Sequence, residues 1–371
     1  MSDRCIVFDH GPSGGGVQFS GPLDIITAAT PEQVPAAFAA LEAAHAKGHW
    51  LAGMASYELG YALIDKLQGH LPSVRKTPLL QFGVFAHGPQ PATPFTSPAV
   101  LPQFTPLWDF ARYKQAFQTV HDYIAAGDIY QANLTFPLQA KTTADPRALY
   151  AALVQKQPVP HGAYVDLGGP VLLSRSPELF FSRTEDGILQ SRPMKGTAPR
   201  DGDADTDLHL RDSLWQSKKN RAENLMIVDL LRNDMSRVSK VGSVKVPDLF
   251  HIESYTTVHQ MTSRIQSQML PDVTLFDLFA ALFPCGSITG APKIRAMEIL
   301  RDVEHGARDA YCGGIGWIAP DGAMEFNVAI RTILAEPDGT LTLNVGGGIV
   351  YDSTAHDEYN EALLKSSFAQ G

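Results

Sequence analysis

The sequence GIGWIAPDGAMEFNVAIRTILAEPDGTLTLNVGGGIV, residues 314–350, decides the fold class. Two Pro-Asp-Gly turns, at residues 320–322 and 337–339, divide it into three strand-like runs. Strands joined by turns this short are antiparallel, because parallel neighbours need crossovers of roughly a dozen residues or more. The stretch therefore predicts an antiparallel meander late in the chain.

The same pattern of strands and tight turns recurs upstream of the meander. Residues 164–174 and 178–192 each have the pattern of a hairpin, with glycine-containing turns. Three longer segments have the apolar spacing and end signals of helices, and these are residues 213–232, 291–305 and 356–368. Antiparallel strands with interspersed helices predict an α+β fold built in layers.

A proline-rich connector marks the expected boundary within the chain. Six prolines fall between residues 88 and 106, together with Thr and Ser, and such a stretch is extended. A chain of 371 residues is long enough for two parts. We therefore predict an N-terminal segment, residues 1–106, and a catalytic domain, residues 107–371.

Composition and charge exclude several classes of function. The chain carries 30 Lys and Arg against 39 Asp and Glu, a net charge of −9, which repels nucleic acid and anionic membranes. Cys5, Cys285 and Cys312 are widely spaced and fit neither a disulfide framework nor a CxxC metal pair. No signal peptide opens the sequence, and no run approaches the roughly 20 apolar residues of a bilayer span. We expect a cytoplasmic protein with neither nucleic acid nor membrane as a partner.

Lys195 is a candidate nucleophile. It lies in the run SRPMKGTAPR, residues 191–200, where Arg192 and Arg200 make the surroundings electropositive. Neighbouring cations favour the neutral form of an amine, and the neutral form is the nucleophile. The alternative is an ordinary solvated loop lysine, and this segment alone does not decide between the two.

Three glutamates form a candidate metal site. Glu223 lies one helical turn before Ile227 of an apolar stripe, so it points near the buried side of its helix. On the last predicted helix, Glu358, Glu361 and Lys365 share one side. They are either a surface ion pair, or carboxylates that hold a divalent cation while Lys365 holds an anionic ligand. Magnesium needs only one or two carboxylates besides water and substrate oxygens.

Two glycine-rich segments allow a ligand to approach the backbone. Residues 286–293, GSITGAPK, precede a predicted helix, but their spacing is not that of a phosphate-binding loop, so we reject a nucleotide site. A helix N-terminus behind such a loop still suits a carboxylate. Gly346-Gly-Gly348 ends the meander and either contacts a ligand or marks a bulge.

Arg331 and His259 are further candidates with open alternatives. By the two-residue period of a strand, Arg331 shares a face with Glu325 and Asn327, so it either binds a ligand carboxylate or pairs with Glu325. His259 has no partner that spacing identifies, and a histidine satisfied within a strand is the simpler interpretation.

Taken together, these segments resemble the chorismate-utilising enzymes. The resemblance covers most of residues 107–371, through blocks at 193–200, 223–234, 259, 286–298, 311–316, 346–349 and 358–365. Residues 55–60, ASYELG, also look like the N-terminal part of anthranilate synthase component I, one branch of that family. The resemblance implies one compact unit of two packed antiparallel sheets with helices outside.

The resemblance also implies chorismate as the substrate and Mg2+ as the cofactor. Chorismate is a dianion without phosphate. The ion would be ligated by Glu223 and Glu361, with Glu358 nearby, and would hold the ring carboxylate. The other groups implied at the ring carboxylate are Lys365, Gly347 and Gly348.

The remaining implied roles concern the other end of the substrate and the chemistry. The enolpyruvyl carboxylate would be bound by Tyr311 and Arg331, and Thr289 is a further substrate-binding candidate. The implied catalytic residues are Lys195 as the nucleophile, Glu178 as the acid that protonates the departing hydroxyl, and His259.

Two positions favour one branch of the family. Isochorismate-forming relatives carry a water-activating lysine where this chain has Gln131, and a glutamine cannot act as a base. Lys195, in Pro193-Met-Lys-Gly-Thr197, is typical of the branch that aminates chorismate at C4. That branch makes 4-amino-4-deoxychorismate, for 4-aminobenzoate and folate, through covalent attack of the lysine at C2.

The resemblance also implies partners and leaves alternatives. No glutaminase sequence is visible, so ammonia would come from a separate glutaminase subunit or from free ammonium. Some relatives hold tryptophan near the N-terminal segment, so tryptophan is a candidate ligand. The alternative activity is anthranilate synthesis, against which Lys195 and residues 286–290 argue. A non-catalytic regulator that binds chorismate or tryptophan is the alternative of another class.

Overall fold

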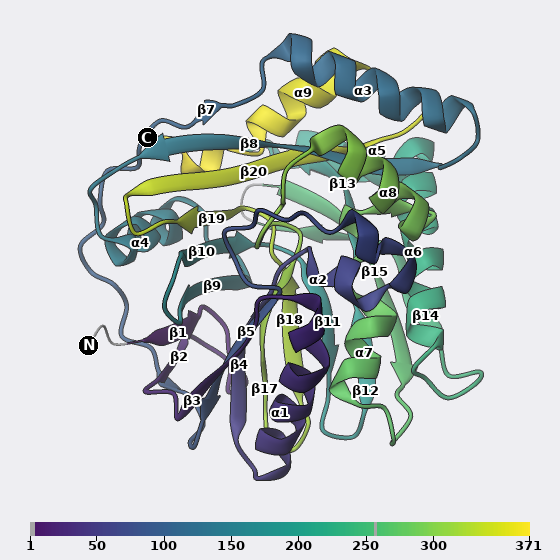
Figure 1. Cartoon of the computed structure of the whole chain (residues 1–371). Helices are drawn as coiled ribbons and strands as arrows, with labels where there is room; N and C mark the ends of the chain where they lie inside the picture. Colours follow the sequence, from purple (N-terminus) through teal and green to yellow (C-terminus); the bar gives the residue numbers. More distant parts are fainter. Residues whose placement is uncertain (1–3, 256–257) are drawn as a thin grey trace.

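The computed structural model describes residues 4–255 and 258–371, in which the strands form two antiparallel ten-stranded sheets (Figure 1). In spatial order the first sheet contains β16 (Gly290–Ala291), β8 (Gln131–Lys141), β20 (Thr340–Ile349), β19 (Thr332–Ala335), β10 (Val171–Ser176), β9 (His161–Asp166), β1 (Cys5–Phe8), β2 (Val17–Ser20) and β6 (Gln90–Pro91), with β7 (Thr105–Pro106) beside β8. The second contains β13 (Met194–Pro199), β15 (Val258–Gln268), β12 (Ile188–Ser191), β11 (Leu179–Arg183), β18 (Met324–Val328), β17 (Gly314–Ile318), β4 (Trp50–Ala55), β5 (Leu80–Phe85) and β3 (Asp24–Ala28), with β14 (Lys245–Ser254) beside β15. The predicted α+β class is confirmed. The start of the opening segment and the two residues before Val258 lie outside the described residues.

Helices cover the outer faces of both sheets. On the first sheet the apolar faces of α3 (Phe110–Ala125), α4 (Pro146–Lys156), α8 (Lys293–Glu304) and α9 (Ala355–Leu364) pack in one core. On the second sheet α1 (Val34–Ala46), α2 (Leu59–Leu63), α6 (Lys218–Ser236) and α7 (Leu275–Leu282) do the same. Between the sheets, Ile6 and Phe19 of the first pack with Met54 and Trp317 of the second. The layers are held together by apolar area buried in three places: under the helices of each sheet and between the two sheets.

The meander consists of two hairpins that lie in different sheets. The turns at 320–322 and 337–339 join β17 to β18 and β19 to β20, as predicted, but the structure has four strands rather than three. The chain crosses between sheets after Val328, and Arg331 there takes a left-handed conformation, with φ 51°. The predicted face shared by Glu325 and Arg331 is therefore wrong, because the strand that carries Glu325 ends before Arg331. Glu325 pairs instead with His161, at 3.0 Å.

The predicted helix 213–232 is two helices. α5 (Ala204–Gln216) ends at Ser217, whose extended backbone begins α6 and whose Oγ accepts a hydrogen bond from the Asn220 amide, at 3.3 Å. A serine in this position satisfies an amide that the first turn of a helix leaves unpaired. The other two predicted helices are confirmed as α8 and α9.

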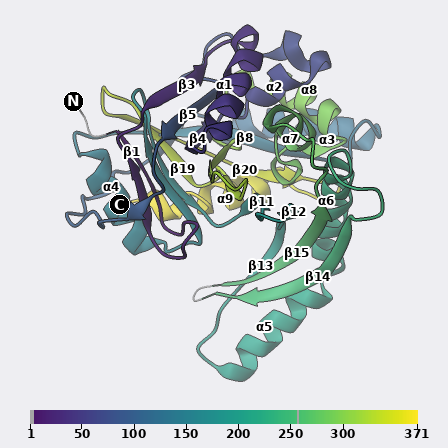
Figure 2. The same ribbon diagram turned by 90° about the horizontal axis from the view of Figure 1, so that it is seen from below.

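One end of the second sheet projects from the body. β13, β14 and β15 extend outward with α5 packed along them, and we call these four elements the arm (Figure 2). A small apolar cluster of Leu214, Ile252 and Met261 holds α5 on the strands.

The N-terminal segment contributes strands to both sheets. β1, β2, β6 and β7 lie in the first sheet and β3, β4 and β5 in the second. The boundary at residue 106 stays a prediction. Within residues 4–255 and 258–371, no helix combines the length and the apolar character needed to cross a lipid bilayer.

Glu58, in the N-terminal segment, should make folding stability depend on pH. Its Oε1 accepts a hydrogen bond from the Arg308 amide, at 2.7 Å, and burial raises the pKa of its carboxyl to about 8. Since the pKa in the unfolded chain is about 4.3, the folded state keeps a proton that the unfolded state releases. Stability should therefore fall as the pH rises from about 5 to about 8, by on the order of 1–3 kcal/mol. Chemical denaturation should show this fall in the wild type and little of it in Glu58→Gln; an equal fall in both would assign it to other groups.

Candidate active site

Lys195 lies in a bulge of the edge strand β13. The pairing of β13 with β15 shifts register between Met194 and Thr197, and Gly196 between them has φ 83°, which favours glycine. Gln260 of β15 holds the bulge, because its Nε2 donates to the Gly196 carbonyl, at 2.8 Å, and its Oε1 accepts from Thr197, at 2.9 Å. The Lys195 side chain is thereby fixed toward the body, where Nζ donates to the Ser287 carbonyl, at 3.1 Å.

Burial is the main cause of a lowered pKa at Lys195. Loss of water around the amine lowers its pKa, and the attraction of Glu178 and Glu223 opposes this. The predicted cause of the lowered pKa, the charges of Arg192 and Arg200, is wrong. Arg192 pairs with Glu253, and Arg200 is paired with an aspartate of α5. An amine that loses its proton more readily is a better nucleophile near neutral pH.

Glu178 lies beside Lys195, where the chain passes from the first sheet to the second. It is 5% exposed, and its Oε1 accepts a hydrogen bond from Ser287 Oγ, at 2.8 Å. Burial raises the pKa of its carboxyl, while the Lys195 charge and the Ser287 hydroxyl lower it. A glutamate with a raised pKa, next to an amine with a lowered one, is suited to acid catalysis.

Arg331 lies at the second crossing between the sheets, next to Glu178. The two crossings are hydrogen-bonded together, since the Val328 amide donates to the Glu178 carbonyl, at 3.0 Å, and the Arg175 amide donates to the Arg331 carbonyl, at 2.9 Å. Burial lowers the pKa of the Arg331 guanidinium, and the negative charge of Glu178 opposes this. Within the described residues, this guanidinium has no hydrogen-bond or ion-pair partner. A mostly buried cation without a partner suits an anionic ligand.

The three candidate metal ligands come from α6 and α9, and Glu361 of α9 lies within electrostatic reach of both Glu223 and Glu358. Burial raises the pKa of Glu223 and of Glu358, and the charge of Glu361 adds to both effects. Glu361 itself pairs with Lys365, at 2.8 Å, and Lys365 Nζ also donates to the Gly346 carbonyl, at 3.0 Å. The predicted i,i+4 ion pair is thus present, and it lies within the electrostatic reach of the other two glutamates.

Gly347 passes close to this carboxylate group. A Cβ built on Gly347 would lie 2.9 Å from Glu358 Oε2 and 3.7 Å from Lys365 Nζ, so a side chain there would intrude between them. Carboxylate oxygens with raised pKa values would be stabilised by a hard divalent cation. No group of three or more His, Cys, Asp or Glu side chains in residues 4–255 and 258–371 forms a ready-made metal site. Glu223 is a carboxylate with a raised pKa, whereas at Glu361 burial is outweighed by Lys365 and other nearby lysines, and the pKa is lowered. Two carboxylates completed by water or substrate oxygens are enough to hold Mg2+.

Thr289 and His259 make their hydrogen bonds elsewhere. The Thr289 hydroxyl is buried and donates to the carbonyls of Cys285 and Gly286 within its own loop. His259 is enclosed in the arm, with Nδ1 2.9 Å from Ser254 Oγ and Nε2 3.0 Å from Asp207 Oδ1. The predicted roles of both residues stay predictions. Tyr311, by contrast, lies near Arg331, and burial raises its pKa well above the usual value.

Three residues that act on the candidate site were not predicted from the sequence. Ser287 contacts both Lys195 and Glu178, Gln260 holds the bulge, and the Lys219 charge acts on all three glutamates. Ser287 lies inside the glycine-rich run that the sequence singled out, so that motif was a signal for it. Nothing local marks Gln260, which is 64 residues from the carbonyl that it binds.

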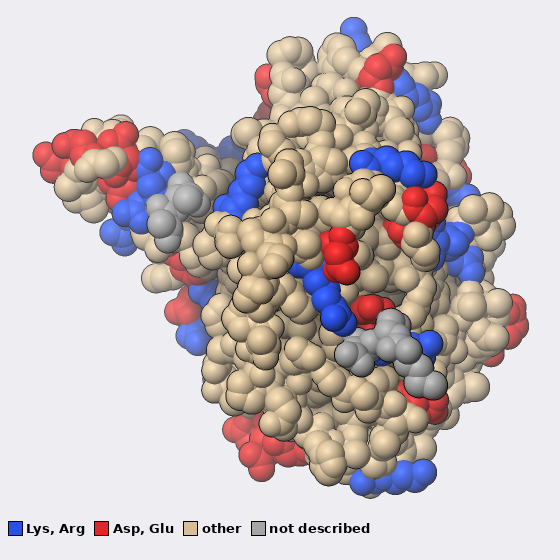
Figure 3. All heavy atoms as spheres, turned by 90° about the vertical axis from the view of Figure 1, so that its left-hand side faces the viewer, with Lys and Arg blue, Asp and Glu red and all other residues tan. Residues whose placement is uncertain are grey.

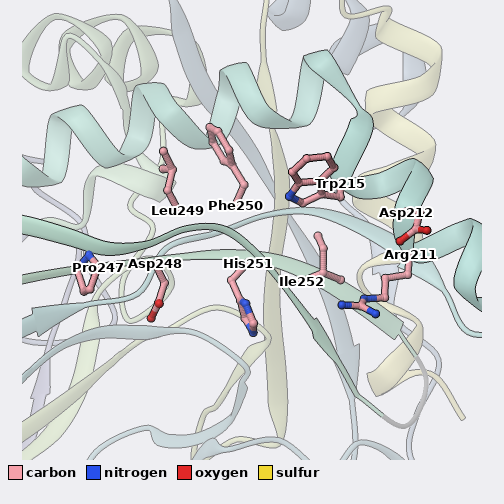
Figure 4. A pocket seen from close by; sticks show the side chains of 9 residues that line it. All are labelled: Arg211, Asp212, Trp215, Pro247, Asp248, Leu249, Phe250, His251 and Ile252. Atoms are coloured by element: carbon pink, nitrogen blue, oxygen red, sulfur yellow. The ribbon is translucent and has the colours of Figure 1, made fainter.

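The arm contains a cavity that is separate from these residues. Its volume is about 430 Å3, and it is lined by Arg211, Asp212 and Trp215 of α5 and by residues 247–252 of β14 (Figure 4). None of the candidate site residues lines it. On the face shown in Figure 3 the arm projects beside the body, and acidic and basic side chains are interspersed.

Comparison with known proteins identifies the family. A family model described as chorismate binding enzyme matches residues 3–371. The chain belongs to this family. It is 41% identical over 275 residues to aminodeoxychorismate synthase component 1 of Escherichia coli, covering 71% of this chain and 60% of the relative. It is 39% identical over 260 residues to anthranilate synthase component 1 of Thermus thermophilus, covering 70% and 56%. The chain thus spans less than two thirds of the length of these curated relatives.

Solved structures support the fold. Anthranilate synthase component I of Streptococcus pneumoniae superposes with a TM-score of 0.76 at 26% identity, covering 87% of this chain and 81% of that one. The menaquinone-specific isochorismate synthase of Escherichia coli gives 0.75 at 16% identity, covering 99% and 87%, a likeness that concerns the fold alone. The expectation of two packed antiparallel sheets with outer helices is confirmed.

Proposed function

We propose that this chorismate-binding chain converts chorismate and ammonia to 4-amino-4-deoxychorismate, as component I of an aminodeoxychorismate synthase. The observation that carries the proposal is the pairing of a half-buried amine with a buried carboxyl through one residue, Ser287. The name of the Escherichia coli relative supports the same reaction. Anthranilate synthesis is the second candidate, favoured by the Thermus thermophilus relative.

The chemistry follows from the two side chains. Neutral Lys195 forms a bond to C2 of chorismate, both ring double bonds shift (C1=C2 to C1=C6 and C5=C6 to C4=C5), and the C4–O bond breaks. Glu178 gives its proton to the departing hydroxyl, which leaves as water. Ammonia then bonds to C4, both double bonds shift back, and the C2–N bond breaks to release Lys195. The proton lost by ammonia restores Glu178, so chorismate and ammonia give 4-amino-4-deoxychorismate and water.

The other candidates bind the two carboxylates of the substrate. Arg331, with Tyr311 beside it, is suited to the enolpyruvyl carboxylate, since a guanidinium can form two parallel hydrogen bonds to such a group. Lys365 and the amides of Gly347 and Gly348 would lie at the ring carboxylate. Magnesium, held by Glu223 and Glu361 with Glu358 nearby, would supply positive charge there when bound.

Partners and compartment are part of the proposal. Ammonia would come from a separate glutaminase subunit or from free ammonium, and tryptophan is retained as a candidate ligand. Cys285 and Cys312 are buried free thiols, which suits a reducing, cytoplasmic compartment.

Product analysis tests the proposal. The chain is incubated with chorismate, Mg2+ and ammonium, with and without an added aminodeoxychorismate lyase. We expect 4-aminobenzoate only when the lyase is present, and loss of product when a chelator removes the metal. Anthranilate without the lyase would instead establish the second candidate, and isochorismate would show that Gln131 does not prevent water addition. No consumption of chorismate under these conditions would contradict both proposed activities.

A further inference from the structure

Ser287 is the residue through which the amine and the carboxyl meet. It is 2% exposed, its carbonyl accepts from Lys195 Nζ, at 3.1 Å, and its hydroxyl donates to Glu178 Oε1, at 2.8 Å. Cys285 Sγ lies 3.2 Å from the same hydroxyl. One short loop residue therefore fixes both the distance between the two groups and the direction of one carboxylate oxygen.

The loop that carries Ser287 is held at several points. The Asn133 amide donates to the Thr289 carbonyl, at 2.8 Å, and Arg308 Nη1 donates to the Ile288 carbonyl, at 3.1 Å. The Thr289 hydroxyl donates back to the carbonyls of Cys285 and Gly286, at 3.3 and 3.2 Å. Since the backbone is tied on both sides of Ser287, its hydroxyl is presented to Glu178 from a fixed support.

We propose that Ser287 is a positioning residue that orients the Glu178 carboxyl for proton transfer and holds Lys195 within reach of the same substrate. The inference rests on the proposed function for its catalytic meaning, but its geometry can be tested without substrate. Ser287 acts through Glu178 and Lys195, because its hydroxyl donates to the first and its carbonyl accepts from the second.

Titratable groups from four elements surround Glu178 and determine what removing the hydroxyl does. They are Lys195 from β13, His161 from β9, Arg331 from the second crossing and the Cys285 thiol from the loop. Lys195, His161 and the Ser287 hydroxyl lower the pKa of Glu178, against burial, which raises it. Because Ser287→Ala leaves the other groups in place and removes one donor to the ionised form, the pKa of Glu178 should rise in that variant.

An infrared titration of the protonated carboxyl tests this directly. The Glu178 band is assigned by its loss in Glu178→Gln, and its midpoint is followed in the full chain without substrate. In Ser287→Ala the midpoint should rise by roughly 0.5 to 1 pH unit, the equivalent of one hydrogen bond. Ser287→Thr, which keeps the hydroxyl, should restore the wild-type midpoint. Ser239→Ala, which removes a buried serine hydroxyl outside the site, should leave it unchanged.

Kinetics then separate positioning from stability. Ser287→Ala should lower kcat by roughly tenfold with little change in KM, and should move the alkaline limb of the kcat profile upward with the infrared midpoint. An unchanged midpoint and an unchanged kcat in a folded Ser287→Ala would overturn the inference. If that variant does not fold, Ser287→Cys, with its weaker donor, must show the same direction of shift. A shifted midpoint in a chain that does not turn over chorismate would contradict the proposed function and leave the geometry of Ser287 established.

Discussion

Lys195→Ala should abolish the covalent adduct with chorismate and lower turnover with ammonium at least about a thousandfold. The amine is the only group proposed to bond to C2, and an alanine leaves substrate binding and acid catalysis without a nucleophile. Intact-mass spectrometry after mixing with chorismate in the absence of ammonium measures the adduct, and lyase-coupled product formation measures turnover.

Lys141→Ala is the matched control for the loss of a lysine. Lys141 is exposed, pairs with Asp338 at 3.2 Å and belongs to β8, so its removal should leave both adduct and turnover unchanged. Normal turnover in Lys195→Ala would eliminate covalent catalysis by this residue. An adduct that persists in Lys195→Ala would assign the bond to another nucleophile.

Arg331→Met should lower kcat/KM by roughly 30- to 1000-fold, since loss of one partner of a buried charge pair costs about 2 to 4 kcal/mol. The effect should lie mostly in KM if the guanidinium binds substrate and transition state alike. The ligand-free variant should be at least as stable as the wild type, because a buried cation without a partner costs free energy in the folded state. Steady-state kinetics and thermal unfolding measure the two expectations separately.

Arg331→Met should lower activity without lowering stability, and this combination distinguishes a ligand-binding role from a structural one. A structural role for Arg331 predicts a lower Tm together with lower activity, and that outcome would exclude an anion-binding role. Arg232→Met removes an exposed arginine that pairs with Asp229 at 2.8 Å, and should change neither quantity by much.

Local signals predicted the hairpins but not how they are distributed. The Pro-Asp-Gly turns identify both pairs of strands in residues 314–350, since turn chemistry is decided by a few neighbouring residues. A period of two says which side chains share a face only while the strand continues. It could not show that the chain leaves one sheet after Val328 and enters the other before Thr332, because that depends on packing between the sheets.

In the candidate site, too, local features were predicted and contacts between distant residues were not. The spacing of Glu358, Glu361 and Lys365 on one helix is local, and the ion pair found there follows from it. The surroundings of Lys195 are not local, because they depend on Ser287, 92 residues further along the chain. His259 likewise meets Asp207, 52 residues away, through the packing of α5 on the arm. Residue types thus indicated the chemistry, while burial and partners required the tertiary structure.

The two hydrogen-bonded crossings have a consequence for how this fold diversifies. Glu178 and Arg331 lie where the chain passes from one sheet to the other. Their relative position therefore depends on how the two sheets pack and changes little when surface turns change. The proposed nucleophile, Lys195, lies instead in a bulge of an edge strand, where a substitution changes few contacts of the two sheets. If the proposed roles hold, the residues that bind the substrate can stay in place while the residue that decides the reaction changes.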